Sequence, residues 1–400
     1  MIRAKKILLL FISAFVIITV ACEHQSPLIA DESQTLDGPV DGLTSDEILN
    51  HLQGDDIFNG RTFTSSNGLG PIFVAQSCNS CHRGDGKSHP FVTVTRFGQT
   101  DETGNKFLVQ GGPEIQSKAL PGFMPEELPS GATFTRLIAP ITAGVGFLEA
   151  VPDSLILSMA DPNDLDHDGI SGVPNWKALP AFIIPNSDAI SQDGKYICKI
   201  GKKASVYNVF EQVVFALNED IGITSEYAPI DPHTLQVSEP EITNDDISAI
   251  AFYLRTLKAP SPRLEENKNI KNGHSVFIAV GCEGCHKETL KTGKAFCEVM
   301  SYKEFHPYTD LLLHDMGPGL DDGYTEGSAK TYEWRTPPLW GLGLAPQSQG
   351  GSYYLLHDGR AHSIEQAILM HGGEAEGRIE NFKKLTQQDK YDLLKFLQSL

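Results

Sequence analysis

Apolar residues follow two kinds of pattern along this chain. Near the start they form an unbroken run over residues 7–20, and later they recur at intervals of three and four in residues 244–257 and 387–400. The second pattern predicts amphipathic helices, each with one buried face. The ends of these two segments also align, residues 251–257 with residues 394–400, which indicates a weak internal repeat.

The start of the chain has the features of an export signal. Arg3, Lys5 and Lys6 precede the apolar run, and Ala21-Cys22 follows it. The run is shorter than the roughly 20 residues that a membrane-spanning helix needs. Residues 19–22 resemble a bacterial lipobox, which implies cleavage before Cys22 and lipidation of its sulfur. We therefore expect a lipoprotein signal peptide at 1–22 and a polar tether at 23–42, with the protein lipid-anchored in the cell envelope and facing the periplasm or the exterior.

Length and charge limit the kind of protein and partner. A chain of 400 residues favours two domains, and the formal net charge is −19. A protein this acidic does not attract nucleic acid through its overall field, whereas a basic redox partner would be attracted. Acidity is also a common means of staying soluble, so the charge alone does not identify the partner.

Two pentapeptides carry the strongest chemical signal. Residues 78–82 and 282–286 both have the form Cys-x-x-Cys-His. In this spacing two thiols add to the vinyl groups on one edge of a porphyrin, and the histidine becomes the proximal ligand of the iron. A thioredoxin-like pair would need a strand before it and a helix after it, and a zinc site would leave both histidines unexplained. We predict two covalently bound haem c groups, attached through Cys78, Cys81, Cys282 and Cys285, with His82 and His286 on the irons.

The predicted fold is mainly α, with two cytochrome c-like domains and long irregular loops. The first haem domain spans 43–260 and contains an insertion between about 95 and 240; the second spans 261–400. Pro260, Ser261 and Pro262 mark the boundary between them. Cys198 and Cys297 remain outside the haem motifs, and the sequence leaves open whether they form a disulfide.

Further blocks along the chain point to one family. They stand at residues 58–61, 146–152, 168–172, 311–317, 335–340, 356–361 and 371–375. In this order, from about residue 55 to the end, the chain resembles the bacterial di-haem oxidoreductases, sometimes called predicted thiol oxidoreductases. These are similar to di-haem cytochrome c peroxidases and to the di-haem enzyme of methylamine utilisation. The Phe-Trp-Asp-Gly-Arg block of typical peroxidases is missing here.

The resemblance implies different ligands for the two irons. An iron with two strong side-chain ligands passes electrons, whereas an open position can bind peroxide. At the place of the peroxidases' distal methionine this chain has His371, which we favour as the distal ligand of the second haem; Met370 and Met316 are the alternatives. No distal candidate stands out for the first haem, since His89 directly precedes a proline and reads as a loop residue.

The resemblance also implies an acid–base group and a cation site. Glu149 is in the segment that matches the peroxidases' acid–base glutamate, which moves a proton between the two oxygens of peroxide. Asp164, Asp166 and Asp168 alternate before a glycine, a pattern that can bind calcium, as the peroxidases do near their haems. The match to a calcium loop is partial, and a solvated acidic turn is the alternative.

These features favour an enzyme. One haem would take electrons from a periplasmic or membrane donor, and the other would reduce peroxide or a similar small-molecule oxidant. The alternative is a di-haem electron carrier with both irons saturated. Disulfide exchange, the family's older label, would require the thiols that haem attachment consumes.

Overall fold

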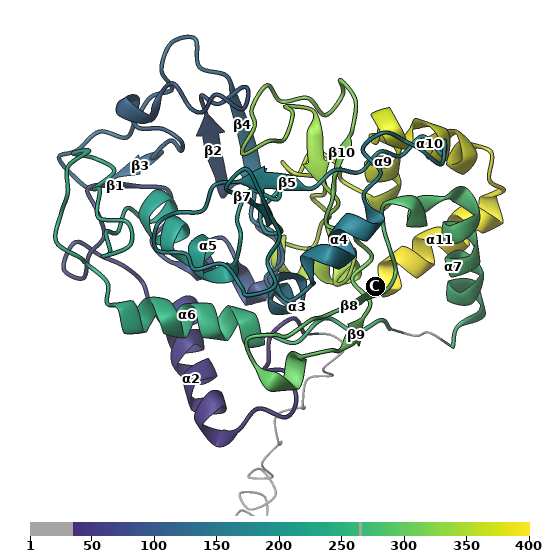
Figure 1. Ribbon diagram of the computed structural model, residues 1–400, viewed down its shortest axis with the longest axis horizontal. Coiled ribbons are helices and arrows are strands. Elements are labelled where there is room, and N and C mark those ends of the chain that lie inside the picture. Colours follow the sequence, from purple (N-terminus) through teal and green to yellow (C-terminus); the bar gives the residue numbers. More distant parts are fainter. Residues whose placement is uncertain (1–34, 264–265) are drawn as a thin grey trace, which may run out of the picture.

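Two helix pairs form the framework of the protein (Figure 1). The computed structural model describes residues 35–263 and 266–400. In the first pair α2 (Ser45–Asp55) crosses α6 (Asn244–Thr256), and in the second α7 (Lys268–Val280) crosses α11 (Gln387–Ser399). The two amphipathic segments expected from the sequence are α6 and α11, so both predicted helices are confirmed. In the chain each haem motif stands between the two helices of one pair.

In each pair a glycine of one helix lies close to the backbone of the other. A Cβ atom on Gly54 would lie 2.1 Å from the carbonyl oxygen of Ala249, and one on Gly273 would lie 2.1 Å from that of Asp392. Glycine is therefore required at both crossings, because any side chain would force the helix backbones apart. This shared detail supports the internal repeat.

Replacing Gly273 with alanine should destabilise the protein by about 1–3 kcal/mol or more, because the added carbon overpacks the α7–α11 crossing. Urea unfolding measures this effect. The matched control is Gly377→Ala in α10 (Glu376–Lys383), where nothing lies within 4 Å of the added carbon; it should be neutral or gain up to about 1 kcal/mol. Equal stability of the two variants would contradict the crossing.

The remaining elements are short and are separated by long irregular segments. Short helices are α3 (Val145–Glu149), α4 (Asp153–Met159), α5 (Val209–Phe215), α8 (Ala345–Ser348) and α9 (Ile364–Leu369), with single turns at η2 (Asp56–Gly60), η3 (Cys78–Ser80), η4 (Arg83–Asp85), η5 (Leu108–Gln110), η6 (Ala216–Asp220), η7 (Cys282–Gly284), η8 (Glu298–Met300), η9 (Leu342–Leu344) and η10 (Gly373–Ala375). Strands are β1 (Ile72–Phe73), β2 (Thr93–Phe97), β3 (Lys118–Ala119), β4 (Phe134–Ile138), β5 (Asn175–Lys177), β6 (Ser191–Gln192), β7 (Lys195–Cys198), β8 (Leu290–Lys291), β9 (Glu304–Phe305), β10 (Leu313–Asp315) and β11 (Glu333–Arg335).

The strands pair into small antiparallel sheets: β1–β3, β2–β4, β8–β9, β10–β11 and β5–β7–β6. The expectation of a mainly α fold is therefore met only in part. The periodicity of the two long helices could be read from the sequence, whereas pairs of two to five residues leave too little pattern to detect.

The two predicted haem domains, 43–260 and 261–400, share one hydrophobic core. They are called the first and second halves below. Phe147 of the first half packs on Phe305 of the second, with ring centroids 5.5 Å apart, and Trp340 continues the cluster. Val173 and Leu313 exchange backbone hydrogen bonds of 2.9 and 2.8 Å across the same boundary. The halves are thus packed against each other over a common interior rather than linked only through residues 260–262.

The N-terminal residues need one correction. The predicted signal peptide and Cys22 lie outside the described residues, as does most of the tether predicted for 23–42. In the part that is described, Leu36 is buried and the Val40 amide donates to the Thr256 carbonyl at 2.8 Å. The end of this segment is therefore packed against α6 rather than free. No helix within the described residues is long and apolar enough to cross a membrane.

Candidate functional site

Both Cys-x-x-Cys-His motifs adopt the same local structure. Each cysteine pair spans a single turn, η3 in the first motif and η7 in the second. The His82 amide donates to the Cys78 carbonyl at 2.9 Å, and the His286 amide donates to the Cys282 carbonyl at 3.0 Å. The turn places both sulfurs and the imidazole at one cavity in each half, the arrangement that the predicted attachment requires.

The second motif opens on a cavity of about 270 Å³ that holds two candidate iron ligands. Both His286 and His371 line it. His286 Nδ1 donates to the Tyr308 carbonyl at 2.9 Å, and His371 Nδ1 donates to the Ala367 carbonyl at 2.7 Å. Each hydrogen bond fixes the ring and leaves Nε2 as the ligand atom. Burial lowers the pKa of both rings, that of His286 to about 4, so both are neutral and able to bind a metal.

Of the two methionines considered as alternatives to His371, only one lies at the cavity. Met316 lines the second cavity, whereas Met370, next to His371 in the chain, does not. α9 ends at Leu369, and the following turn directs His371 rather than its neighbour to the cavity. This geometry favours His371 over Met316 and Met370. His371 lines the cavity, and its imidazole is oriented by a hydrogen bond to the Ala367 carbonyl.

The first motif opens on a larger cavity of about 430 Å³. His82 lines it, and burial lowers the pKa of this imidazole to about 4. Among the residues that the structure describes, no second histidine and no methionine line this cavity, and His89 lies outside it. One difference between the cavities follows the sequence expectation: the second holds a further candidate ligand, His371, and the described part of the first holds no second histidine. The first cavity also has a group of charged side chains at its wall that the sequence analysis did not single out.

Those charged side chains form a cluster around Arg96 on β2. Its guanidinium bonds to Glu114 at 3.2 Å, to Glu326 at 2.6 Å and to Glu219. All four side chains line the first cavity. Burial opposes the charge on Glu326, but the Arg96 guanidinium outweighs it and holds the pKa of that carboxyl at about 2. The arginine thus fixes several carboxylates at one wall of the cavity.

Glu114 and Asp220 form a second, proton-holding part of this cluster. Burial and the neighbouring Asp220 carboxylate raise the pKa of Glu114 well above its ordinary value, and burial also raises that of Asp220. Two close carboxyls in a low-dielectric site cannot both ionise easily, so once one proton has been lost the pair holds the other more tightly. Glu114 Oε1 is buried and accepts no hydrogen bond from the described residues. A carboxyl that carries a proton beside a cavity can deliver it there.

Glu149 is placed elsewhere. Its carboxylate accepts from the Arg255 guanidinium at 2.9 Å and from the Val209 amide at 2.7 Å, and it lines neither cavity. This carboxylate ties α3 to α5 and α6. The geometry does not support the acid–base role expected for Glu149, and Glu114 occupies a position that suits that role.

The acidic loop is only partly as expected. Carboxylate oxygens of Asp161, Asp164 and Asp166 lie within 4.8 Å of one another, close enough to share one cation. Asp168 instead pairs with Arg378 at 3.1 Å. Asp161, Asp164 and Asp166 therefore form the group that can bind a cation. Asp161 takes the place that the sequence prediction gave to Asp168.

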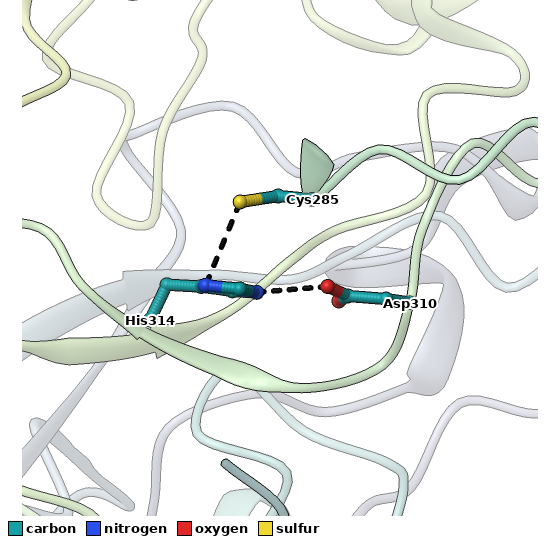
Figure 2. Close-up of side chains that lie close together, drawn as sticks. All are labelled: Cys285, Asp310 and His314. Carbon is teal, nitrogen blue, oxygen red and sulfur yellow. Dashed lines mark hydrogen bonds and ion pairs between the residues drawn. The ribbon is translucent and has the colours of Figure 1, made fainter. Parts of the chain in front are cut away.

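A buried histidine lies beside the second haem motif (Figure 2). His314 Nε2 is 2.8 Å from Asp310 and Nδ1 is 2.7 Å from Glu374, while Cys285 Sγ is 3.5 Å from Nδ1. Burial disfavours a charged ring, but these acceptors outweigh it and raise the pKa of His314 well above its ordinary value. The imidazolium clamps Glu374, which follows His371 closely in the chain, so it holds the segment that presents the second ligand.

Cys198 and Cys297 are both buried and are not bonded to each other. Cys198 is in β7, and Cys297 lies in the core that the two halves share. Each packs as a small apolar residue, so the fold does not depend on a disulfide between them.

The residues of both cavities fit haem. Each cavity is lined mainly by apolar side chains and has a cysteine pair and a neutral histidine at its wall. In the second, two imidazoles have Nε2 available. The sites could also be recognised from the pentapeptides alone, whereas Arg96, Glu114 and Asp220 carry no local sequence signal, since pairing of distant segments brings them together.

The sequence matches the family described as "Di-haem oxidoreductase, putative peroxidase" over residues 27–101, 133–234 and 228–400. The chain therefore belongs to the di-haem oxidoreductase family, and the resemblance stated from its motifs is confirmed. Haem is the cofactor that this family implies, and electron transfer is its chemistry. No curated protein matches the chain significantly.

Two solved structures are similar over most of the chain. A hydrazine synthase structure from Kuenenia stuttgartiensis has 14% sequence identity, covers 91% of this chain and 94% of its own, and gives a TM-score of 0.37. A MauG-like protein associated with microbial copper homeostasis has 16% identity, covers 91% of each chain and gives a TM-score of 0.40. At these scores neither structure informs on the chemistry of this protein.

Proposed function

We propose that this protein is a di-haem c-type oxidoreductase that reduces peroxide, or a similar small-molecule oxidant, at its first haem. His286 and His371 would hold a haem in the second cavity, and a haem bound there would pass electrons from an external donor to the first site. The observation that carries the proposal is the asymmetry of the two cavities. The second cavity has two imidazoles, His286 and His371, that are oriented by hydrogen bonds to backbone carbonyls. The first cavity has one imidazole, His82, and a carboxylate cluster around Arg96.

The first cavity supplies what peroxide reduction needs from a protein. Two electrons and two protons break the O–O bond and give two molecules of water. Bound haem supplies the iron that accepts the oxidant and the electrons. Glu114, sharing a proton with Asp220, is the acid that delivers a proton to the departing oxygen. Arg96 holds Glu114 in place at the wall of the cavity.

The cellular setting is part of the same proposal. The export signal and Cys22 favour a lipid anchor in the cell envelope, with a periplasmic or membrane electron donor. The net charge of −19 favours a donor with a basic docking face. The acidic loop, through Asp161, Asp164 and Asp166, is proposed to bind calcium.

Carbon monoxide binding tests the proposed asymmetry. In the fully reduced protein, carbon monoxide should bind to one haem per chain, because His371 saturates the second iron while the first remains accessible. Optical titration counts the sites. A di-haem carrier with both irons saturated would bind none, and that result would contradict the proposed function while leaving haem attachment intact.

A further inference from the structure

We propose that Lys87, Lys202 and Arg335 form a carboxylate-binding site in the wall between the two cavities, and that its ligands are the propionate groups of the two haems. The inference depends on haem occupying both cavities but not on peroxide reduction. The three residues are called the cationic wall below.

The cationic wall lies where the cavities meet. Residues 140, 141, 145 and 200–202 line both cavities, so a single layer of protein separates them. Lys202 is the one charged residue among these shared positions. Lys87 and Arg335 line the second cavity, and the Arg335 amide donates to the Lys202 carbonyl at 3.0 Å. Three cations from separate parts of the chain are thus gathered at one place.

Several other shielded cations among the described residues have a carboxylate partner. Lys199 pairs with Asp153 at 2.9 Å, Arg255 with Glu149 at 2.9 Å, and Arg96 with three glutamates. Within residues 35–263 and 266–400, no ion pair is formed by a member of the cationic wall. A shielded charge without a partner is costly, so the wall is built for an anion that comes from outside the polypeptide.

The lowered pKa values of the two lysines in the cationic wall also favour an anionic ligand. Burial, together with the charges of Lys87 and Arg335, lowers the pKa of Lys202 to about 7. Burial alone lowers that of Lys87 to about 8. Since like charges repel here, an anion between them would restore the charged form of both lysines.

Available N–H groups of Arg335 and Trp340 also favour an anionic ligand. Arg335 Nε donates to the Gly201 carbonyl at 2.8 Å and one terminal nitrogen to the Thr336 carbonyl at 3.3 Å, which leaves further N–H groups of its guanidinium available. Trp340 Nε1 is buried at the second cavity, and no described residue accepts its hydrogen bond. A carboxylate is the acceptor that such a set of cationic and neutral donors fits best.

Haem chemistry selects the propionates as the ligands. The thioether bonds form at one edge of a porphyrin, and its two carboxylates project from the opposite edge. With the vinyl edges held at Cys78–Cys81 and Cys282–Cys285, the carboxylate edges would project away from these cysteines, and Lys202 is at the wall of both cavities to bind them. A small carboxylate from solution has the same chemistry and is the other source that an experiment must distinguish.

Spectroelectrochemical titration of the holoprotein tests the cationic wall. In Lys202→Met both midpoint potentials should fall, since an unpaired propionate favours ferric iron; the ratio of reduced to oxidised haem at a fixed potential should drop about tenfold, equivalent to 59 mV. Lys87→Met should lower only the potential of the second haem, because Lys87 lines only that cavity. Lys202→Arg should restore the native values, and Lys291→Met, exposed and outside both cavities, is the matched control.

Two results would overturn this assignment. The first is native potentials in both Lys202→Met and Lys87→Met with two haems bound. The second is a response to acetate: if added acetate shifts the potentials of the native protein but not those of Lys202→Met, the wall binds free carboxylates rather than propionates. Should Lys202→Met fail to take up haem, Lys87→Met carries the test alone, because its site is only partly enclosed.

Discussion

Peroxide reduction should slow by about 10²–10⁴-fold when Glu114 is replaced by glutamine, the range that loss of a general acid produces. Glutamine keeps the shape of the side chain and its contact with Arg96, but it cannot release a proton. Steady-state turnover with a reduced electron donor gives the rate, and the spectra of both haems show whether the cofactors remain in place. Glu102→Gln, on an exposed side chain outside the cavities, is the matched control.

The Glu149→Gln variant separates the two candidate carboxylates. Glu149 holds Arg255 and the start of α5, so its replacement should lower stability while the rate per haem-loaded molecule stays within a few-fold of native. A large loss of rate in Glu149→Gln, with native rates in Glu114→Gln, would restore the assignment that the family resemblance suggested and refute the one made from the cavity.

The second large effect is expected at the other haem. Replacing His371 with glycine removes the proposed distal ligand, so the second iron should change from low spin to high spin and the number of carbon monoxide sites per chain should rise from one to two. Electron paramagnetic resonance and optical spectra detect the change. Met370→Leu is the matched control, because that neighbour does not line the cavity and its replacement should leave the spectrum unchanged.

A low-spin second haem in His371→Gly would show that another residue binds the iron; Met316 and His357 also line that cavity. His314 is a separate case, since its ring is clamped between Asp310 and Glu374. Its loss would loosen the segment that carries His371 rather than remove a ligand.

The features that the sequence predicted well are those with short-range rules. The haem motifs are complete within five residues, and the helical spacing of 244–257 and 387–400 identified α6 and α11. His371 was proposed through its place in a family pattern, and it lines the second cavity. Each of these signals is local, and the structure needs only to bring the segments to their cavities.

The features that were missed depend on contacts between distant segments. Arg96 of β2 meets Glu114 through an isolated β-bridge, and Glu326 reaches the first cavity from a segment far along the chain. Glu149 lies outside both cavities because the motif that resembles a peroxidase segment forms α3 here, and α3 packs closely on α6. Asp168 left the acidic set because Arg378, far along the chain, pairs with it.

The central claim is that porphyrin is bonded to the protein at both pentapeptides, and mass spectrometry of the mature protein tests it most directly. Purified from a host that matures c-type cytochromes, the chain should carry the mass of two haems, with one haem on the peptide containing Cys78 and Cys81 and one on the peptide containing Cys282 and Cys285. Free thiols on both peptides, in protein without added haem mass, would contradict the account.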